Sequence, residues 1–424
     1  MRQLTEWDTQ DDLHLKLCPV LQLCAVNTIS ERLFPNLNTL TLWPATYKSI
    51  PFIPSLLSPR TTVIDMTFGQ HDFPILMVAS MMTTFSTLCP NLQSVSLLPL
   101  PRDPMIVTAV SRMVLANNRN TLRNFMVDSP LTEEAREVVY RLPALCQLSL
   151  VIEKETPLPS AVLPNLTRLV IKYDHESDWL GVFRGATFGK LEAVRFNCKS
   201  ERIGDFLEAF EKVALAASVQ ETLSDFYLSI SYSWIPHYPS LLPFTQLKDL
   251  VIDFPCGHQC SSAIDDGIII DIARAMPRMK TLQLGGLPYQ ASTGVTAKGL
   301  TVLAHHCPDL SSLCIHFQAA SLGDPLTVAE MVYNVGSATL RRNYALKTFE
   351  VGETPVSEES VPFIALALSC IFPRLEYVDD DVHRSWEKVM DLIRTSRQGA
   401  DYSGEEYALS FRGFGDTSQQ PHST

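Results

Sequence analysis

Three short stretches of this 424-residue chain carry side chains of the kinds that bind metal ions. Residues 256–260 (CGHQC) place two thiols and an imidazole within five positions, residues 305–307 (HHC) set ligand types side by side, and residues 379–381 (DDD) form an acidic run. A structural zinc site needs about four tetrahedral ligands, and no second CxxC or HxxxH lies near residues 256–260. We therefore expect a loop with incidental thiols there and a solvated strand exit at residues 379–381. Neither a metal nor another cofactor is predicted.

The sequence also lacks the motifs that accompany the commonest forms of enzyme chemistry. It contains no G-x-S-x-G nucleophile elbow, no glycine-rich phosphate loop and no H-E-x-x-H pair. Gly285 and Gly286 are followed by Leu287-Pro288, a pattern typical of a turn. We predict no catalytic residues, and a repeat-bearing hydrolase is kept only as a remote alternative.

Charge and composition exclude several classes of partner. The formal net charge is -12, and no run of basic residues offsets it, so nucleic acids and anionic membranes are disfavoured. The longest apolar stretch, residues 361–372, is much shorter than the roughly 20 residues of a membrane span. The ten cysteines show no disulfide spacing, which favours a reducing compartment. A soluble protein of the cytoplasm or nucleus is expected.

Residues 294–317 (GVTAKGLTVLAHHCPDLSSLCIHF) define the unit on which the chain is built. Ala297, Leu300, Leu303 and Ala304 lie three or four positions apart and form one apolar stripe of a helix. The Cys307-Pro308 step ends that helix, because proline disfavours helical geometry in the residue before it. The pattern LxxLxL that follows, residues 310–315, predicts a short strand with one buried face.

About a dozen copies of this strand pattern follow one another at steps of roughly 21 to 36 residues, which overlaps the period of leucine-rich repeats and exceeds it in places. Copies such as FPNLNTLTL (34–42), CPNLQSVSL (89–97) and LPNLTRLVI (163–171) begin at a proline, while residues 63–68 are a weaker copy. Helical patterns fill the intervals at residues 106–115, 132–142, 203–216, 264–276, 328–335 and 361–371.

Strands that run the same way and are joined by helices on one side build a parallel sheet with a helical layer. The predicted fold is therefore α/β, a leucine-rich-repeat solenoid in the form of a horseshoe or arc, with strands on the concave side and helices on the convex side. Thr132 and Ser357 precede pairs of glutamates and are predicted helix caps. We expect residues 1–33 to be an N-terminal cap or degenerate repeat, residues 34–397 an irregular array, and residues 398–424 a partly disordered tail.

The strand pattern also assigns a candidate binding surface. The last two apolar positions of LxxLxL point inward, so the residues before and between them line the concave face. This face is predicted to be basic in the middle of the array and acidic later, with the tyrosines as candidate anchors. The alternative is ordinary variation of a solvent-facing surface. The candidate residues are Arg168, Val170, Lys172, Arg195, Asn197, Asp225, Tyr227, Asp249, Asp253, Thr348, Glu350, Tyr377 and Asp379.

Residues 294–317 resemble the cysteine-containing leucine-rich repeat of F-box proteins, G-[IV]-T-x-x-G-L-x-x-L-A-x-x-C-P-x-L-x-x-L-x-L. The match runs from Gly294 through Gly299 and Cys307 to Ile315. With its repeated FPNL and CPNL strands, the chain from about Leu13 to Asp380 is similar to the large fungal families of F-box proteins with degenerate repeats. The resemblance implies that the repeats bind a protein substrate and that an N-terminal F-box docks on the adaptor of a cullin-based ubiquitin ligase.

Residues 1–33 depart from that family, because they contain no LPxEILxxIF pattern and Trp7 is the sole trace of an F-box junction. Two explanations stay open: an F-box belongs upstream of Met1 and is missing from the gene model, or this paralogue has lost it. The expected function is accordingly a substrate-recognition subunit of F-box type, and the alternative is an interaction scaffold without a ligase connection.

Overall fold

The computed structural model divides the chain into two compact units, Met1–Leu223 and Ser224–Thr424, which we describe separately. The residues that the structure describes are 3–7, 34–45, 50–68, 74–100, 102–116, 120–152, 162–173, 187–198, 203–216, 219–230, 238–253, 264–285, 294–336, 341–351, 354–379 and 384–399.

Unit 1 is built on a parallel sheet whose strands follow one another in chain order, β1-β2-β3-β4-β5-β6-β8-β10. A separate two-stranded parallel sheet joins β7 to β9. The strands are β1 (Gln3–Trp7), β2 (Thr39–Ala45), β3 (Val63–Phe68), β4 (Ser94–Leu98), β5 (Asn124–Val127), β6 (Gln147–Ile152), β7 (Val162–Leu163), β8 (Arg168–Tyr173), β9 (Thr187–Phe188) and β10 (Ala193–Cys198).

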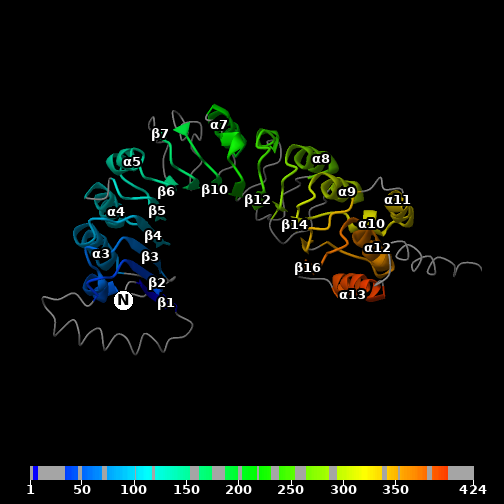
Figure 1. Ribbon diagram of the computed structural model, residues 1–424, viewed down its shortest axis with the longest axis horizontal. Helices are drawn as coiled ribbons and strands as arrows, with labels where there is room; N and C mark the ends of the chain where they lie inside the picture. The colour runs from blue at the N-terminus through cyan, green and yellow to red at the C-terminus, as the bar shows by residue number, and fades with distance from the viewer. Residues whose placement is uncertain are drawn as a thin grey trace, which may run out of the picture. The chain divides into compact units, whose positions relative to one another are not determined.

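Helices connect these strands, and Figure 1 shows α3, α4 and α5 along one side of the sheet of unit 1. Because each helix returns the chain to the start of the next strand, all the strand pairings given by the structure are parallel. The helical elements are η1 (Ile50–Phe52), α2 (Ile53–Leu56), α3 (Ile75–Leu88), α4 (Pro104–Ala116), α5 (Glu133–Val139), α7 (Ile203–Ala216) and η2 (Val219–Glu221).

Unit 2 repeats the same plan with the strand order β11-β12-β13-β14-β15-β16. Its strands are β11 (Asp225–Ile230), β12 (Asp249–Asp253), β13 (Thr281–Leu284), β14 (Ser312–Ile315), β15 (Thr348–Glu350) and β16 (Tyr377–Asp379). Its helical elements are η3 (Tyr238–Leu241), α8 (Asp266–Ala275), α9 (Ala297–His306), α10 (Ala319–Gly323), α11 (Pro325–Gly336), η4 (Glu358–Ser360), α12 (Val361–Ile371) and α13 (Arg384–Gly399). The fold is an α/β leucine-rich-repeat solenoid, as predicted.

Each strand buries the apolar positions of LxxLxL toward the helices. In β12, Leu250 and Ile252 are fully buried, whereas the alternate positions Asp249, Val251 and Asp253 are half-buried on the opposite face. This alternation follows from the two-residue period of a strand. The side chains of the uncovered face are therefore fixed by the leucine pattern.

The register between repeats is set by one backbone carbonyl at the start of each strand. The carbonyl of Lys248 accepts hydrogen bonds from the amides of Lys280 and Thr281 at 2.6 and 3.0 Å, and the carbonyl of Lys280 does the same for Ser311 and Ser312. In unit 1, Gln93 accepts from Arg123 and Asn124 in the same manner. Consecutive strands are therefore aligned without slippage at their amino ends.

The helix side of the array is held by polar atoms that bond to the backbone of a neighbouring repeat. The buried Cys307 thiol lies 3.6 Å from the carbonyl oxygen of Met276, and its own carbonyl accepts a 2.8 Å hydrogen bond from the amide group of Asn343. Asn343 is fully buried, and its oxygen accepts from the amides of Ala345 and Leu346. These contacts satisfy polar groups that would be costly to bury without partners.

In the repeat of residues 294–317, the helix α9 begins on a carboxylate of the preceding repeat. Asp266 accepts hydrogen bonds from the amide and hydroxyl of Thr296 at 2.8 and 2.6 Å and from the amide of Gly299 at 3.1 Å. A Cβ atom at residue 299 would lie 2.6 Å from the Asp266 oxygen. Glycine at this position therefore lets a neighbouring carboxylate reach the free amides at the start of the helix.

Most of the predicted helices are found close to their expected bounds, and Thr132 caps α5 by accepting from the amide of Ala135. Ser357 does not cap α12, because its hydroxyl bonds to that of Ser360 and the helix begins at Val361 after a 3-10 turn. Four α-helices of the described residues were not predicted, namely α2, α3, α10 and α13. The sequence of α3 is apolar on most sides, so its face contrast is weak, and α2 and α10 span only four and five residues.

Helix α13 closes the described part of unit 2 by packing on α12. Trp386 is buried and donates a 2.9 Å hydrogen bond to the carbonyl of Thr354, while Glu387 and Lys388 are exposed. A polar outer face of this kind is what a terminal repeat needs to end an array. Within the described residues, none of the helices has both the length and the apolar character required to cross a membrane. The predicted boundaries at residues 33/34 and 397/398 stay predictions.

Replacing Gly299 with alanine tests the contact with Asp266. At an unobstructed helix position this change stabilises a protein by about 1 kcal/mol. Here it should instead lower the free energy of unfolding by about 2 kcal/mol, because the carboxylate is displaced from its amide partners. Urea denaturation of wild type, G299A, D266A and the double variant measures the effect. In the D266A background the loss caused by G299A should fall to near zero or reverse, and equal losses in both backgrounds would contradict this explanation.

Candidate protein-binding surface

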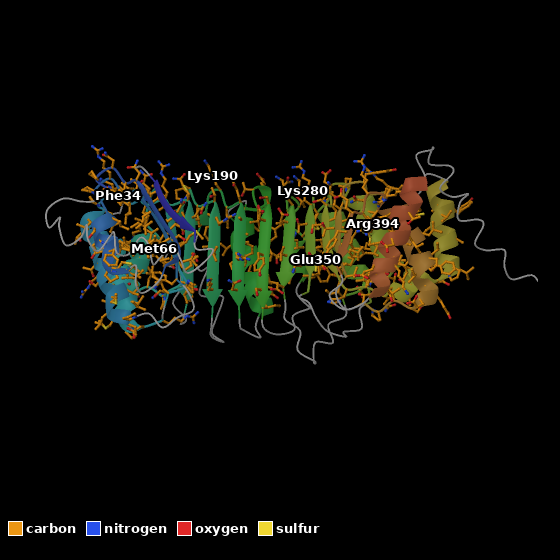
Figure 2. The ribbon with its side chains drawn as sticks, turned by 90° about the horizontal axis from the view of Figure 1, so that it is seen from below. Phe34, Met66, Lys190, Lys280, Glu350 and Arg394 are labelled. Carbon is orange, nitrogen blue, oxygen red and sulfur yellow. The ribbon has the colours of Figure 1, made fainter. Side chains whose placement is uncertain are left out.

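The candidate residues of unit 2 lie together on the face of the sheet opposite α8, α9 and α12. We call this surface the acidic face, and Figure 2 looks onto it, with Glu350 on the strand face and Lys280 at the edge where the strands begin. Its members are the outward strand positions Asp225, Tyr227, Asp249, Val251, Asp253, Thr281, Gln283, Ser312, Cys314, Thr348, Glu350, Tyr377 and Asp379.

Strand register sets carboxylates side by side at two places on the acidic face. Asp225 of β11 pairs in register with Asp249 of β12, and Glu350 of β15 pairs with Asp379 of β16. Neighbouring parallel strands lie about 4.8 Å apart, so side chains at registered positions are in direct contact range. Sequence alone does not disclose these pairs, because the members of each are separated by more than twenty residues.

The environment of Asp249 disfavours its charged form. Burial is the main cause of its raised pKa. A hydrogen bond with Asp225 and the negative charge of Asp225 raise the pKa further. A hydrogen bond with Thr281 and the positive charge of Lys280 lower it and so oppose the shift. The Ser224 hydroxyl donates a hydrogen bond to Asp225. The Asp225–Asp249 pair is therefore a site at which negative charge is concentrated and only partly compensated.

Cys314 occupies the centre of the acidic face, between the two carboxylate pairs. Its pKa is raised well above the ordinary range by burial first, and then by the charge of Glu350, a hydrogen bond with Glu350, and the charges of Asp253 and Asp379. Three carboxylates from three strands thus act on one thiol. The thiol is held in its protonated form and is unsuited to nucleophilic chemistry.

The tyrosines flank the two carboxylate pairs. Tyr227 lies two positions after Asp225 in β11 and is half-buried, and Tyr377 lies two positions before Asp379 in β16 and is exposed. The Tyr377 hydroxyl donates a 3.2 Å hydrogen bond to Asp379. Each carboxylate pair therefore has an aromatic ring on the same strand and the same face.

In unit 1, the candidate residues lie on β8 and β10, and they are less basic than their sequence indicated. Arg168 and Arg195 are exposed and Asn197 is half-buried, while Val170 is almost fully buried. Lys172, however, forms a 2.9 Å ion pair with Asp128, 44 residues earlier in the chain. The charge of Lys172 is compensated within unit 1, and Arg168 and Arg195 are the other positive side chains of this stretch.

A row of lysines that was not predicted from the sequence precedes the strands of unit 2. Lys248, Lys280 and Lys347 occupy the position whose carbonyl holds the next repeat, and their side chains are exposed. Lys347 forms a 3.1 Å ion pair with Glu376. Aligning the repeats on the residue before each strand would have found this row.

Of the three stretches with metal-binding side chains, the structure describes residues 305–307 and residue 379. Residues 256–260, 380 and 381 lie outside the described residues. Cys307 is buried in the repeat core, and burial raises its pKa to about 12. The rings of His305 and His306 contact each other at 4.9 Å, and burial, followed by His305 and Arg274, lowers the pKa of His306. Among the residues that the structure describes, no group of three or more His, Cys, Asp or Glu side chains is arranged to hold a metal.

No family model matches the chain, and no curated protein matches it in sequence. Among solved structures, it is similar to an internalin from Listeria monocytogenes, with a TM-score of 0.36 and 11% sequence identity over 83% of this chain and 76% of that chain. The repeat assignment itself stands on the parallel strand register of each unit.

Replacing Asp249 with asparagine should remove the repulsion in its pair. The raised pKa means that folded protein holds a proton more tightly than unfolded protein, so wild type gains stability as pH falls through this pKa toward the ordinary value of 3.8. Above the raised pKa, D249N should be more stable by about 0.5 kcal/mol. That advantage should disappear as the solution is acidified. Urea unfolding across this range measures it, and Asp309→Asn, an exposed carboxylate elsewhere, is the control. A less stable D249N at neutral pH would contradict the repulsion.

Proposed function

We propose that this chain is a protein-binding module and not an enzyme, and that it binds its partner through the uncovered faces of its sheets. The observation that supports this is the set of polar and charged side chains that the strand register holds in rows on those faces. Preorganised side chains on a rigid scaffold lose little conformational freedom on binding, which favours recognition of a protein surface. Solenoids commonly present such extended surfaces.

The finer proposal is that the partner is a substrate and that the chain acts as a substrate-recognition subunit of F-box type for a cullin-based ubiquitin ligase. It is supported by the resemblance of residues 294–317 to the cysteine-containing repeat of F-box proteins. Such a role would locate the chain in the cytoplasm or nucleus. The alternative with the same fold is an interaction scaffold without a ligase connection, which the departure of residues 1–33 from the F-box pattern favours.

The face of unit 1 can be tested by reversing Arg168 and Arg195 to glutamate in the full chain. Lys172 is left intact, because a glutamate there would meet Asp128 and disturb the fold. Capture of partner proteins should fall by about tenfold, the loss expected when charged contacts are removed from an interface, while the thermal melt stays unchanged. Lys212→Glu, an exposed position on α7, is the matched control. Unaltered capture by the double variant would mean that this face does not bind.

The ligase proposal has a separate test. Sequencing the 5′ end of the transcript shows whether an in-frame F-box precedes Met1, and a pull-down with the resulting chain shows whether a cullin adaptor is recovered. We expect both an F-box and the adaptor. A transcript without an F-box, together with no recovered adaptor, would leave the scaffold function as the conclusion.

A further inference from the structure

We propose that the acidic face of unit 2 binds an extended, basic segment of a partner protein that carries two arginine or lysine residues six positions apart. This inference rests on the proposed protein-binding function and names the chemistry of the partner. It comes from the arrangement of the two carboxylate pairs, the tyrosines beside them and the neutral strands between them.

The two registered carboxylate pairs carry repulsion that the face relieves only in part, through Lys280 and Thr281 at Asp249 and through Tyr377 at Asp379. Like charges directly opposite one another on neighbouring strands destabilise a sheet. Five of the described strand positions of the acidic face are carboxylates, Asp225, Asp249, Asp253, Glu350 and Asp379. None of the strand positions that define this face is lysine or arginine. A cationic side chain from a partner would remove the repulsion at each pair, so part of the free energy of binding is already stored in the unbound face.

Each pair has the surroundings of a site for one cationic side chain. One site combines Asp225 and Asp249 with Tyr227, and the other combines Glu350 and Asp379 with Tyr377. Carboxylates make charge-assisted hydrogen bonds to guanidinium or ammonium groups, and a tyrosine ring adds a cation–π contact. Tyr377 is 51% exposed, so its ring is accessible to such a contact.

The spacing of the two sites selects the spacing of the cations. The centre of the Asp225–Asp249 pair lies four strand intervals from the centre of the Glu350–Asp379 pair, and Glu350 is two residues further along the register than Asp249. At about 4.8 Å per interval and about 3.3 Å per residue, the two sites are roughly 20 Å apart. The strands between them, β13 and β14, present only neutral side chains to this face, Thr281, Gln283, Ser312 and Cys314. An extended segment advances about 3.3 Å per residue and therefore crosses this distance in about six residues.

A separation of six residues also satisfies the geometry of an extended chain. Side chains in such a chain alternate between opposite sides, so an even separation directs both cations toward the sheet. A separation of five would direct one of them into solvent. The lysines at the strand starts, Lys248 and Lys280, repel a basic segment at that edge and confine it to the rows of carboxylates.

Synthetic peptides test the proposal directly. A fluorescent peptide with two arginines six positions apart in a Gly/Ser background, titrated with the full chain and followed by anisotropy, should bind about tenfold more tightly than a peptide with two arginines five positions apart, because only the former engages both sites. The D249N/E350Q double variant should lose about tenfold in affinity. Asp309→Asn with Glu330→Gln is the matched control, because it removes the same charge from exposed positions away from the acidic face.

Several outcomes would overturn the proposal. Equal binding of the two peptides, or an equal loss in the control variant, would reduce the effect to general attraction by an acidic protein. Saturable binding of calcium ions that D249N/E350Q abolishes, with no peptide binding, would replace the peptide by a divalent cation. If D249N/E350Q still captures the cellular partner as wild type does, the protein-binding function stands and the acidic face is not its site.

Discussion

The structure depends on the carbonyl group that precedes each strand. In each unit this one acceptor takes two amides of the next repeat, as Lys248 does for Lys280 and Thr281. A one-residue slip would exchange the buried and uncovered faces of a strand, so this contact preserves both the core and the surface. Loops of very different length can then be inserted between repeats without altering the register, which explains the irregular spacing of the strand patterns.

The helix layer is held in place by side chains that form hydrogen bonds with the neighbouring repeat. Asp266 binds the first turn of α9, and Cys307 and Asn343 bond to backbone groups of neighbouring repeats. These contacts explain three residues of the repeat motif in physical terms. Thr296 and Gly299 provide the amides that the carboxylate binds, and the cysteine provides a small apolar group that still donates a weak hydrogen bond.

The strand register also determines which charged side chains lie together on the surface. Because the register is fixed where each strand begins, carboxylates that fall at equivalent positions of adjacent repeats lie side by side, as Asp225 and Asp249 do. In unit 1 the register brings Asp128 to Lys172 and forms an ion pair. Lys172 is thus compensated by a carboxylate, whereas the carboxylates of the Asp225–Asp249 pair are compensated only in part.

The sequence by itself determined the repeat, the direction of each strand and the face on which a given side chain lies, because the leucine pattern and the period of a strand are local properties. It also excluded the common catalytic motifs. Only the tertiary structure decided which charges meet. Lys172 and Asp128 are 44 residues apart, and the Asp225–Asp249 and Glu350–Asp379 pairs arise from registers between strands. Irregular loop lengths hide such registers from the sequence, since the register is set by backbone hydrogen bonds and not by the spacing along the chain.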